Sequence, residues 1–248
     1  MLGLEENFIK IIAIAVFFII GCYGYLHRIL DKSGVVSGII VGTLIIFLLP
    51  IEWFAPFIAL FFIGGLTAKY KYDEKEIMGI AERKEGRSVK NILANCGAAF
   101  VCILLYALNN NPAYDPVFLA GYLCALATAA SDSAAAEIGQ LSGKRPILIT
   151  TLKPVKTGTD GAISLLGEIT GLIVAMAVAI IPLILGVEHG INYFIIGTIV
   201  GFLGCHVDSL VGATLELRGT VGNHGTNLIA TTSGAIIGMV LFLWFFVV

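Results

Sequence analysis

The sequence predicts an all-α fold, a polytopic bundle of transmembrane helices. Hydrophobic residues make up 58% of the 248 residues and charged residues only 13%, whereas a soluble domain carries about 25% charged residues. The mean hydropathy is +0.95. Polar residues are confined to short stretches between long apolar runs. A chain of this length forms one packed core, so we expect a single integral membrane domain over residues 1–248.

Eight apolar runs come close to the length of about 20 residues that a helix needs to cross a bilayer. They cover residues 8–26, 35–50, 52–68, 92–108, 115–136, 162–186, 190–214 and 226–247. The run 35–50 is short, so a bundle of seven spans is the alternative to eight.

The basic residues predict an orientation. Apart from Lys10, every lysine and arginine lies in or beside the first, third, fifth or seventh connection between these runs. Because basic residues collect on the cytoplasmic side, we expect a cell-membrane protein with both termini outside. The polar stretches around 87–95, 131–168 and 205–227 would then form a site facing the cytoplasm. The net charge of −2 gives no indication of a nucleic-acid partner, and none is expected.

The stretch from Ser131 to Gly161 places three carboxylates and four basic residues between two strongly apolar runs. It begins S-D-S-A-A-A-E-I-G, and ionisable residues at membrane depth are candidates for function. Asp132 and Glu137 are five residues apart, about 140° around an ideal helix. They can bind one ion only if the helix bends or ends there. The alternative is that they form ion pairs with the basic residues that follow.

The end of this stretch, K-P-V-K-T-G-T-D-G, suits a phosphate chain. Its glycines allow backbone N–H groups to approach a ligand. A helix that begins near Asp160 would direct its positive end at the phosphates, and Lys153 and Lys156 add charge. The alternative is ordinary N-capping by Thr159 or Asp160, with the lysines extending to lipid headgroups.

Asp208 is the acidic residue of the glycine-rich run 190–214, and no basic residue is near it in sequence. An isolated intramembrane aspartate suggests a metal ion or a proton. The pairs Asp132-Ser133 and Asp208-Ser209 both lie late in their runs, and Gly-Thr turns follow each. This pattern indicates a possible parallel internal repeat, which would let the two carboxylates face each other.

Two stripes of polar side chains enter other runs. Arg87, Asn91 and Asn95 recur every four residues, so on a helix they share one face. Asn223 and Asn227 have the same spacing at the start of the last run. Carboxamides in an apolar run need polar partners. They either bond to neighbouring helices or face a polar ligand.

These residues favour a magnesium-dependent enzyme that acts on a phosphorylated lipid. Mg²⁺ is typically held by one or two carboxylates together with substrate phosphates, and phosphoryl transfer requires mainly positioning and electrostatic stabilisation. An ion-coupled transporter is the rival class, because acidic residues in glycine-rich helices also couple ions. The acidic residues, however, cluster toward one face, and transport sites lie near the midplane.

Three ordered motifs resemble the phytyl-phosphate kinase family of the vitamin E pathway, which includes the transmembrane protein 19 group. They are S-D-S-A-A-A-E-I-G, R-P-I-L-I-T-T-L-K-P-V-K-T-G-T-D-G-A-I-S and V-D-S-L-V-G-A-T-L-E. The first two also look distantly like the phytol and dolichol kinases and the lipid cytidylyltransferases. This chain has Asp132-Ser133 where the family has Asp-Thr, and Gly161-Ala162 where it has two glycines. A prokaryotic member, archaeal or bacterial, is expected.

The resemblance implies a CTP-preferring kinase that converts a prenyl monophosphate, such as phytyl, geranylgeranyl or farnesyl phosphate, to its diphosphate. The catalytic residues would be Asp132, Asp208, Lys153 and Lys156, and Mg²⁺ would lie on Asp132, Glu137 and Asp208. Substrate and nucleotide would be bound by Ser133, Thr157, Gly158, Thr159, Asp160, Gly161, Arg87, Asn91, Asn95, Asn223 and Asn227. The expected partners are the lipid phosphate, a nucleotide and the bilayer. A CTP-dependent cytidylyltransferase is the alternative enzyme.

Overall fold

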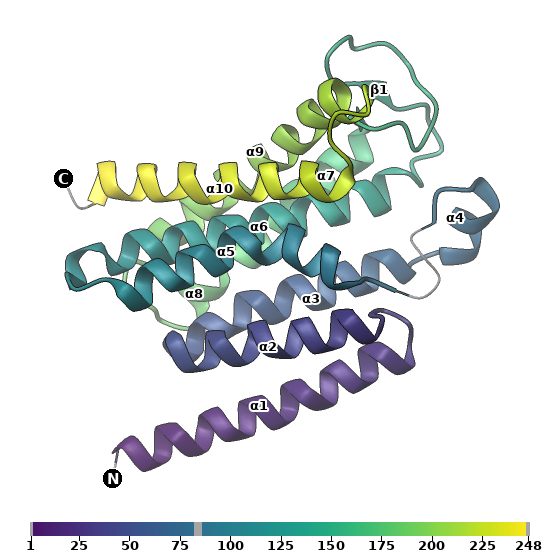
Figure 1. The fold of residues 1–248 in the computed structure, drawn as a ribbon. Coiled ribbons are helices and arrows are strands. Elements are labelled where there is room, and N and C mark those ends of the chain that lie inside the picture. Colours follow the sequence, from purple (N-terminus) through teal and green to yellow (C-terminus); the bar gives the residue numbers. More distant parts are fainter. Residues whose placement is uncertain (1, 82–85, 247–248) are drawn as a thin grey trace.

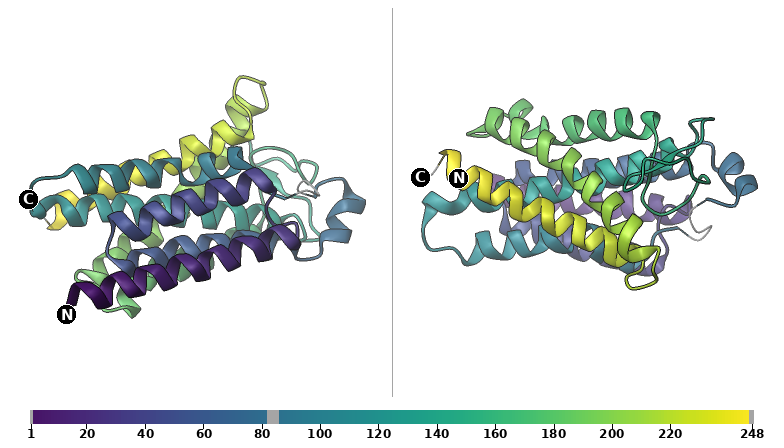
Figure 2. Two further views of the ribbon diagram at one scale, coloured as in Figure 1. Left: turned by 60° about the horizontal axis from the view of Figure 1, so that its bottom comes forward. Right: turned by 90° about the horizontal axis from the view of Figure 1, so that it is seen from above.

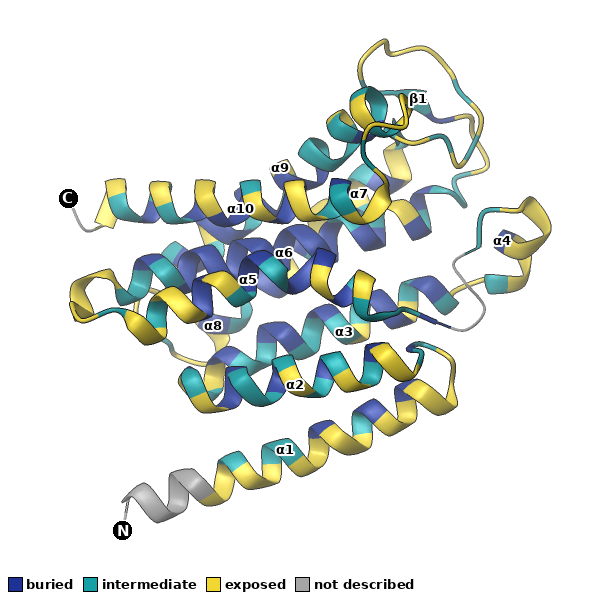
Figure 3. Ribbon diagram, in the orientation of Figure 1, coloured by how far each residue is buried: buried dark blue, intermediate teal, exposed yellow. Residues whose placement is uncertain are grey.

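The protein is a bundle of long helices in the computed structural model, which describes residues 2–81 and 86–246. Within these residues, seven helices are long and apolar enough to cross a membrane. The short run expected at 35–50 is the 17-residue helix α2, Lys32–Leu48. Large apolar side chains are exposed on many helices (Figure 3), and a surface of this kind suits lipid contact rather than water. The predicted all-α, polytopic fold is confirmed.

The elements follow one another with short connections. In chain order they are α1 (Leu2–Leu26), α2 (Lys32–Leu48), the 3₁₀-helix η1 (Ile51–Trp53), α3 (Phe54–Lys69), α4 (Tyr72–Met78), α5 (Val89–Leu108), the 3₁₀-helix η2 (Pro112–Tyr114), α6 (Asp115–Gly139), β1 (Ile147–Leu148), β2 (Ala162–Ile163), α7 (Leu165–Ala179), α8 (Ile181–Ile184), α9 (Gly190–Val211), the π-helix η3 (Gly212–Glu216) and α10 (Asn223–Phe246).

Both chain ends lie at one end of the bundle, and the longest connections lie at the other (Figures 1 and 2). We call the second end the loop end; it carries α4 and the segment 140–164 with β1 and β2. Of the basic residues used to predict an orientation, Arg83 and Lys84 lie outside the described residues. The predicted internal repeat stays a prediction.

Helix α6 is the centre of the bundle and packs against α3, α5, α7, α9 and α10. It is dark along most of its length in Figure 3 because 18 of its 25 residues are buried. Its alanines let neighbours approach closely, a common packing device in membranes. Gly204 of α9 faces Thr128 so closely that a β-carbon there would lie 2.9 Å from the Thr128 Cβ. Asp132 is thus carried on a helix fixed from several sides.

One predicted helix boundary is wrong. The run 162–186 was expected to be one helix that begins near Asp160. Instead, Ile163 and Ala162 pair in antiparallel register with Ile147 and Leu148, and α7 begins at Leu165. The Ser164 Oγ accepts a hydrogen bond from the Gly167 N–H at 3.1 Å, which makes Ser164 the N-cap. Gly161 has a φ of +73°, which turns the chain out of the helical path before this point.

Candidate functional site

A cleft at the loop end gathers the acidic residues of several helices. It is open to solvent, and its empty space, open solvent included, is about 850 Å³. It lies between the last turns of α6 and α9, the first turns of α7 and α10, and the turn 157–161. The polar residues that line it are Asp132, Gln140, Thr157, Thr159, Asp160, Ser164, Glu168, Cys205, Asp208, Ser209, Glu216 and Asn223. Eight of the residues predicted for the site therefore border one space: Asp132, Thr157, Gly158, Thr159, Asp160, Gly161, Asp208 and Asn223.

The carboxylates of this cleft interact electrostatically. Asp132, Asp160 and Glu216 all act on Asp208, and Arg87 is the basic residue that acts on Asp132. Within 2–81 and 86–246, no lysine or arginine lines the cleft. Several negative charges in one cleft favour the binding of a cation. Carboxylate oxygens are hard ligands that suit Mg²⁺. In the described part of the chain, no three acidic, histidine or cysteine side chains are close enough to hold a metal ion by themselves. A metal ion bound among the described residues would therefore need further ligands from outside the protein, such as phosphate oxygens.

Glu216 was missed by the motif reading, although it ends the segment V-D-S-L-V-G-A-T-L-E. On an ideal α-helix it would lie about 80° away from Asp208, eight residues earlier. The π-helix Gly212–Glu216 adds a residue to that turn, which brings Glu216 toward the cleft. The Thr226 Oγ1 donates a hydrogen bond to Glu216 Oε2 at 3.0 Å. A π-turn leaves no clear mark in a sequence, so only the fold could place this carboxylate.

The turn Thr157–Gly161 lies against α9 and forms one wall of the cleft. Gly158 and Gly161 have φ of +84° and +73°, which glycine adopts without strain. The Thr159 Oγ1 donates to the Lys156 carbonyl at 2.7 Å, and Gly161 packs directly on Gly212, whose β-carbon would lie 2.8 Å from the Gly161 nitrogen. The close contact between Gly161 and Gly212 brings this turn near Asp208.

Lys153 and Lys156 are exposed, and their side chains do not line the cleft. Their backbones shape the loop: the Lys153 carbonyl accepts from the Leu148 N–H at 2.9 Å, and the Lys156 carbonyl accepts from Thr159. Neither ammonium group therefore forms part of the wall of the cleft.

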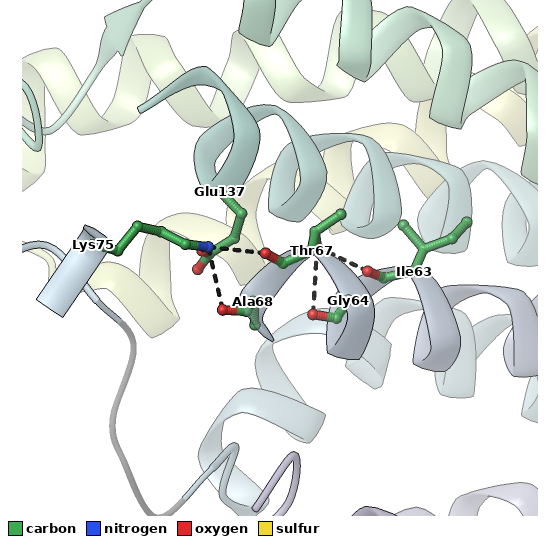
Figure 4. Close-up of polar contacts among 6 residues, drawn as sticks. All are labelled: Ile63, Gly64, Thr67, Ala68, Lys75 and Glu137. Carbon is green, nitrogen blue, oxygen red and sulfur yellow. Dashed lines mark hydrogen bonds and ion pairs between the residues drawn. The ribbon is translucent and has the colours of Figure 1, made fainter. Parts of the chain in front are cut away.

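Glu137 and Ser133 are buried and lie outside the cleft lining. Helix α6 continues to Gly139, so the bend that would bring Glu137 to the ion of Asp132 does not occur. The Glu137 carboxylate accepts instead from the Lys75 ammonium, with 2.5 Å between Nζ and Oε2 (Figure 4). An ion pair was the alternative expected for Glu137, but its partner Lys75 lies 62 residues before Glu137 in the sequence and does not follow it.

The two asparagines of α10 lie at or beside the cleft, and Asn227 contacts Asp208. Asn223 is the first residue of α10 and lines the cleft. When the side-chain amide of Asn227 is oriented with its nitrogen toward Asp208, this nitrogen donates to Asp208 Oδ2 and to the Asn223 carbonyl, each at 3.2 Å. Asn227 therefore orients a candidate metal ligand.

Arg87 does not share a helical stripe with the asparagines, because α5 begins at Val89 and Ser88 is its N-cap. Asn91 completes this cap: its Oδ1 accepts from the Ser88 N–H at 3.1 Å. The backbone of Arg87 pairs instead with the loop after α1, where its N–H donates to the Ile29 carbonyl at 2.9 Å. The expected stripe is thus partly a helix cap.

A second, smaller pocket lies beside Arg87. Its empty space, open solvent included, is about 390 Å³, and it is lined by Ile29, Leu30, Leu60, Phe61, Gly65, Arg87, Asn91, Ile92, Asn95 and Cys96. Asn95 is 7% exposed, and its Oδ1 has no hydrogen-bond partner among the described residues. Buried polar atoms are normally paired, so a ligand with a donor group would suit this position. Arg87 links the pocket to the cleft, since it borders the first and acts on Asp132 in the second.

Glu168, which lines the cleft, is hydrogen-bonded to His206 of α9. The distance from His206 Nε2 to Glu168 Oε2 is 2.9 Å, and the other ring nitrogen, Nδ1, lies 2.9 Å from the Phe202 carbonyl. No sequence spacing pointed to this pair, because its members lie on different helices.

Fold and site together define a class: an integral membrane protein whose acidic residues gather in a cleft at one end of a helical bundle. The chain belongs to the integral membrane protein family DUF92, whose model matches residues 15–236.

Relatives match over most of the chain. It is 34% identical to the uncharacterized membrane protein MJ0933 of Methanocaldococcus jannaschii over 87% of both chains. It is 32% identical to the uncharacterized membrane protein sll0875 of Synechocystis over 86% of this chain and 82% of the relative. Protein VTE6, chloroplastic, of Arabidopsis thaliana is 28% identical over 86% of this chain and 65% of the plant protein. No solved structure matches the chain.

Proposed function

We propose that this protein is a magnesium-dependent, CTP-preferring kinase that converts a prenyl monophosphate to its diphosphate. The observation that carries the proposal is that Asp132 of α6 and Asp208 of α9 line one cleft with the glycine turn 157–161. Carboxylates for Mg²⁺ and backbone N–H groups for phosphates are the main needs of phosphoryl transfer. The resemblance of the three ordered motifs to the phytyl-phosphate kinases supports the same chemistry.

Asp132 and Asp208 would hold the metal ion, and we leave Glu137 out because Lys75 occupies its carboxylate. When bound, Mg²⁺ would neutralise charge on the β- and γ-phosphates of the nucleotide. Asn227 keeps the Asp208 carboxylate in place. The turn 157–161 would bind the phosphate chain through its N–H groups, with Lys153 and Lys156 adding charge from its flank.

The acceptor, the prenyl monophosphate, would bind in the pocket beside Arg87. Its walls are largely apolar, from Leu60, Phe61 and Ile92, and suit the first part of a prenyl chain. The Arg87 guanidinium would bind the monophosphate near Asp132. An oxygen of that phosphate is already an anionic nucleophile, so it needs no general base. It would form a bond to the γ-phosphorus as the bond from that phosphorus to the β–γ bridging oxygen breaks, and CDP would leave.

The test is an assay of the purified protein with geranylgeranyl or phytyl monophosphate, CTP and Mg²⁺. We expect the lipid diphosphate and CDP in equal amounts, and no product when the metal is chelated. Release of pyrophosphate with transfer of CMP to the lipid would identify a cytidylyltransferase instead. Ion flux into liposomes without turnover would identify a transporter. Labelling the exposed Lys144 from either side of sealed vesicles would test the proposed cytoplasmic orientation of the cleft.

Substitution of Arg87 should weaken binding of the lipid selectively. In Arg87→Gln we expect the KM for the prenyl monophosphate to rise about tenfold or more, because a charge-assisted hydrogen bond to phosphate is lost. The KM for CTP should stay within about twofold. Steady-state kinetics with each substrate varied in turn would measure both. Arg145→Gln is the matched control, since Arg145 is exposed and does not line either pocket. An equal rise in both KM values would contradict the assignment.

A further inference from the structure

Lys75 is a fully buried cation on the short helix α4, at the loop end. Its ammonium donates to Glu137 Oε2 at 2.5 Å, to the Thr67 carbonyl at 2.9 Å and to the Ala68 carbonyl at 3.2 Å (Figure 4). An ammonium group has three donors, so each has a partner. The two carbonyls belong to the last turn of α3, where a helix leaves its carbonyls unpaired. Lys75 therefore joins α4 to the ends of both α3 and α6.

A buried ion pair is a poor way to add stability, because desolvation of both charges offsets their attraction. Its better attested effect is to specify one arrangement over others. The same helix shows the contrast: Lys71 and Glu74 form a pair at 3.1 Å whose side chains are 45% and 56% exposed. Such an exposed pair has little effect on structure. The role of Lys75 is thus to fix the position of α4.

The chain that leaves α4 contacts the glycine turn of the cleft. Gly79 ends the helix in the left-handed region, and the Ile80 N–H donates back to the Lys75 carbonyl at 3.0 Å. Ile80 packs closely against Gly158: a β-carbon added to Gly158 would be 2.8 Å from the Ile80 Cγ2. A line of direct contacts therefore runs from Glu137 through Lys75 and Ile80 to the turn.

We propose that residues 72–81 form a clasp that holds the turn 157–161 in the shape that binds polyphosphate. Glu137, Lys75 and Ile80 are its positioning residues. The ligand assigned to the turn rests on the proposed function, whereas the mechanical role of the clasp does not. The glycine turn belongs to the long connection between α6 and α7. Its N–H groups bind phosphates well only when they are held in the right orientation beforehand. The clasp supplies a second point of attachment, in addition to the contact between Gly161 and Gly212.

The clasp is tested by hydrogen exchange on the full chain in detergent, followed at the amides of Thr159 and Ala162. These amides donate to the carbonyls of Lys156 and Thr159 at 3.2 and 3.1 Å. We expect exchange about tenfold faster in Lys75→Met and in Ile80→Ala, with amides in α9 and α10 unchanged. Lys71→Met, on the exposed pair of the same helix, should exchange like the wild type.

Ile80→Val is the conservative rescue, because valine keeps a γ-methyl group against Gly158; its exchange should match the wild type. Where the assay detects kinase activity, Lys75→Met and Ile80→Ala should raise the KM for CTP about tenfold and leave the KM for the lipid unchanged. A purely stabilising role would not divide the two KM values in this way.

Unchanged exchange of the turn in both Lys75→Met and Ile80→Ala would overturn the clasp. If Lys75→Met loosens every helix, Ile80→Ala decides: faster exchange confined to the turn supports the clasp, and wild-type exchange rejects it. Faster exchange of the turn in a protein without kinase activity would support the clasp while rejecting the proposed function. The two proposals therefore fail separately.

Discussion

Asp132→Asn and Asp208→Asn are each expected to lower kcat for phosphoryl transfer on the order of 10²–10³-fold, the loss typical when one group that stabilises transition-state charge is removed. Both carboxylates line the cleft, and asparagine keeps the size of the side chain while removing its charge. The loss should be accompanied by a higher requirement for Mg²⁺. Steady-state rates at saturating CTP, measured over a range of Mg²⁺ concentrations, would show both effects.

These variants should remain folded. Asp208 lies in the field of Asp132, Asp160 and Glu216, so removal of one charge relieves repulsion. We expect thermal midpoints without Mg²⁺ at or above that of the wild type. Glu188→Gln is the matched control, because that carboxylate is 91% exposed in the loop before α9 and lies outside the cleft lining. Activity of the two aspartate variants within twofold of the wild type would remove both residues from the site.

Gly161→Ala is expected to lower kcat/KM for CTP by about 10²-fold, the effect of misplacing a reacting group by about 1 Å. A β-carbon at this position would overlap the backbone of Ser209 and Ala213. The turn would have to move away from α9, and its N–H groups would move with it. Kinetics with CTP varied, together with CTP binding by calorimetry, would measure the loss.

Gly143→Ala isolates the backbone part of this effect. Gly143 also has a positive φ, of +67°, but nothing lies within 4 Å of a β-carbon there. Both variants share a strain of about 1 kcal/mol or more from the left-handed conformation, and only Gly161→Ala adds a collision. We expect Gly143→Ala to keep kcat/KM within about twofold. Equal losses in the two variants would mean that strain, and not contact with α9, controls the turn.

The sequence by itself determined the membrane fold, because all the spans but the short run at 35–50 are apolar runs long enough to be recognised without a partner. It also located Asp132, Asp208 and the turn 157–161, since charge and glycine are conspicuous in such runs. Their meeting in one cleft could not be derived from the sequence, because the side chains that line it come from separate helices.

Tertiary structure decided what depends on contacts between distant residues. Glu137 carried the same acidic signal as Asp132, yet it pairs with Lys75, and no local spacing encodes a partner 62 residues away. Glu216 reaches the cleft through a π-turn. Arg87 lies before the start of α5, because Ser88 is the N-cap of that helix. The start of α7 at Leu165 depends on a strand pair that forms across the loop. Local patterns fix which segments become helices, whereas the partner of a buried charge is fixed by which helices pack together.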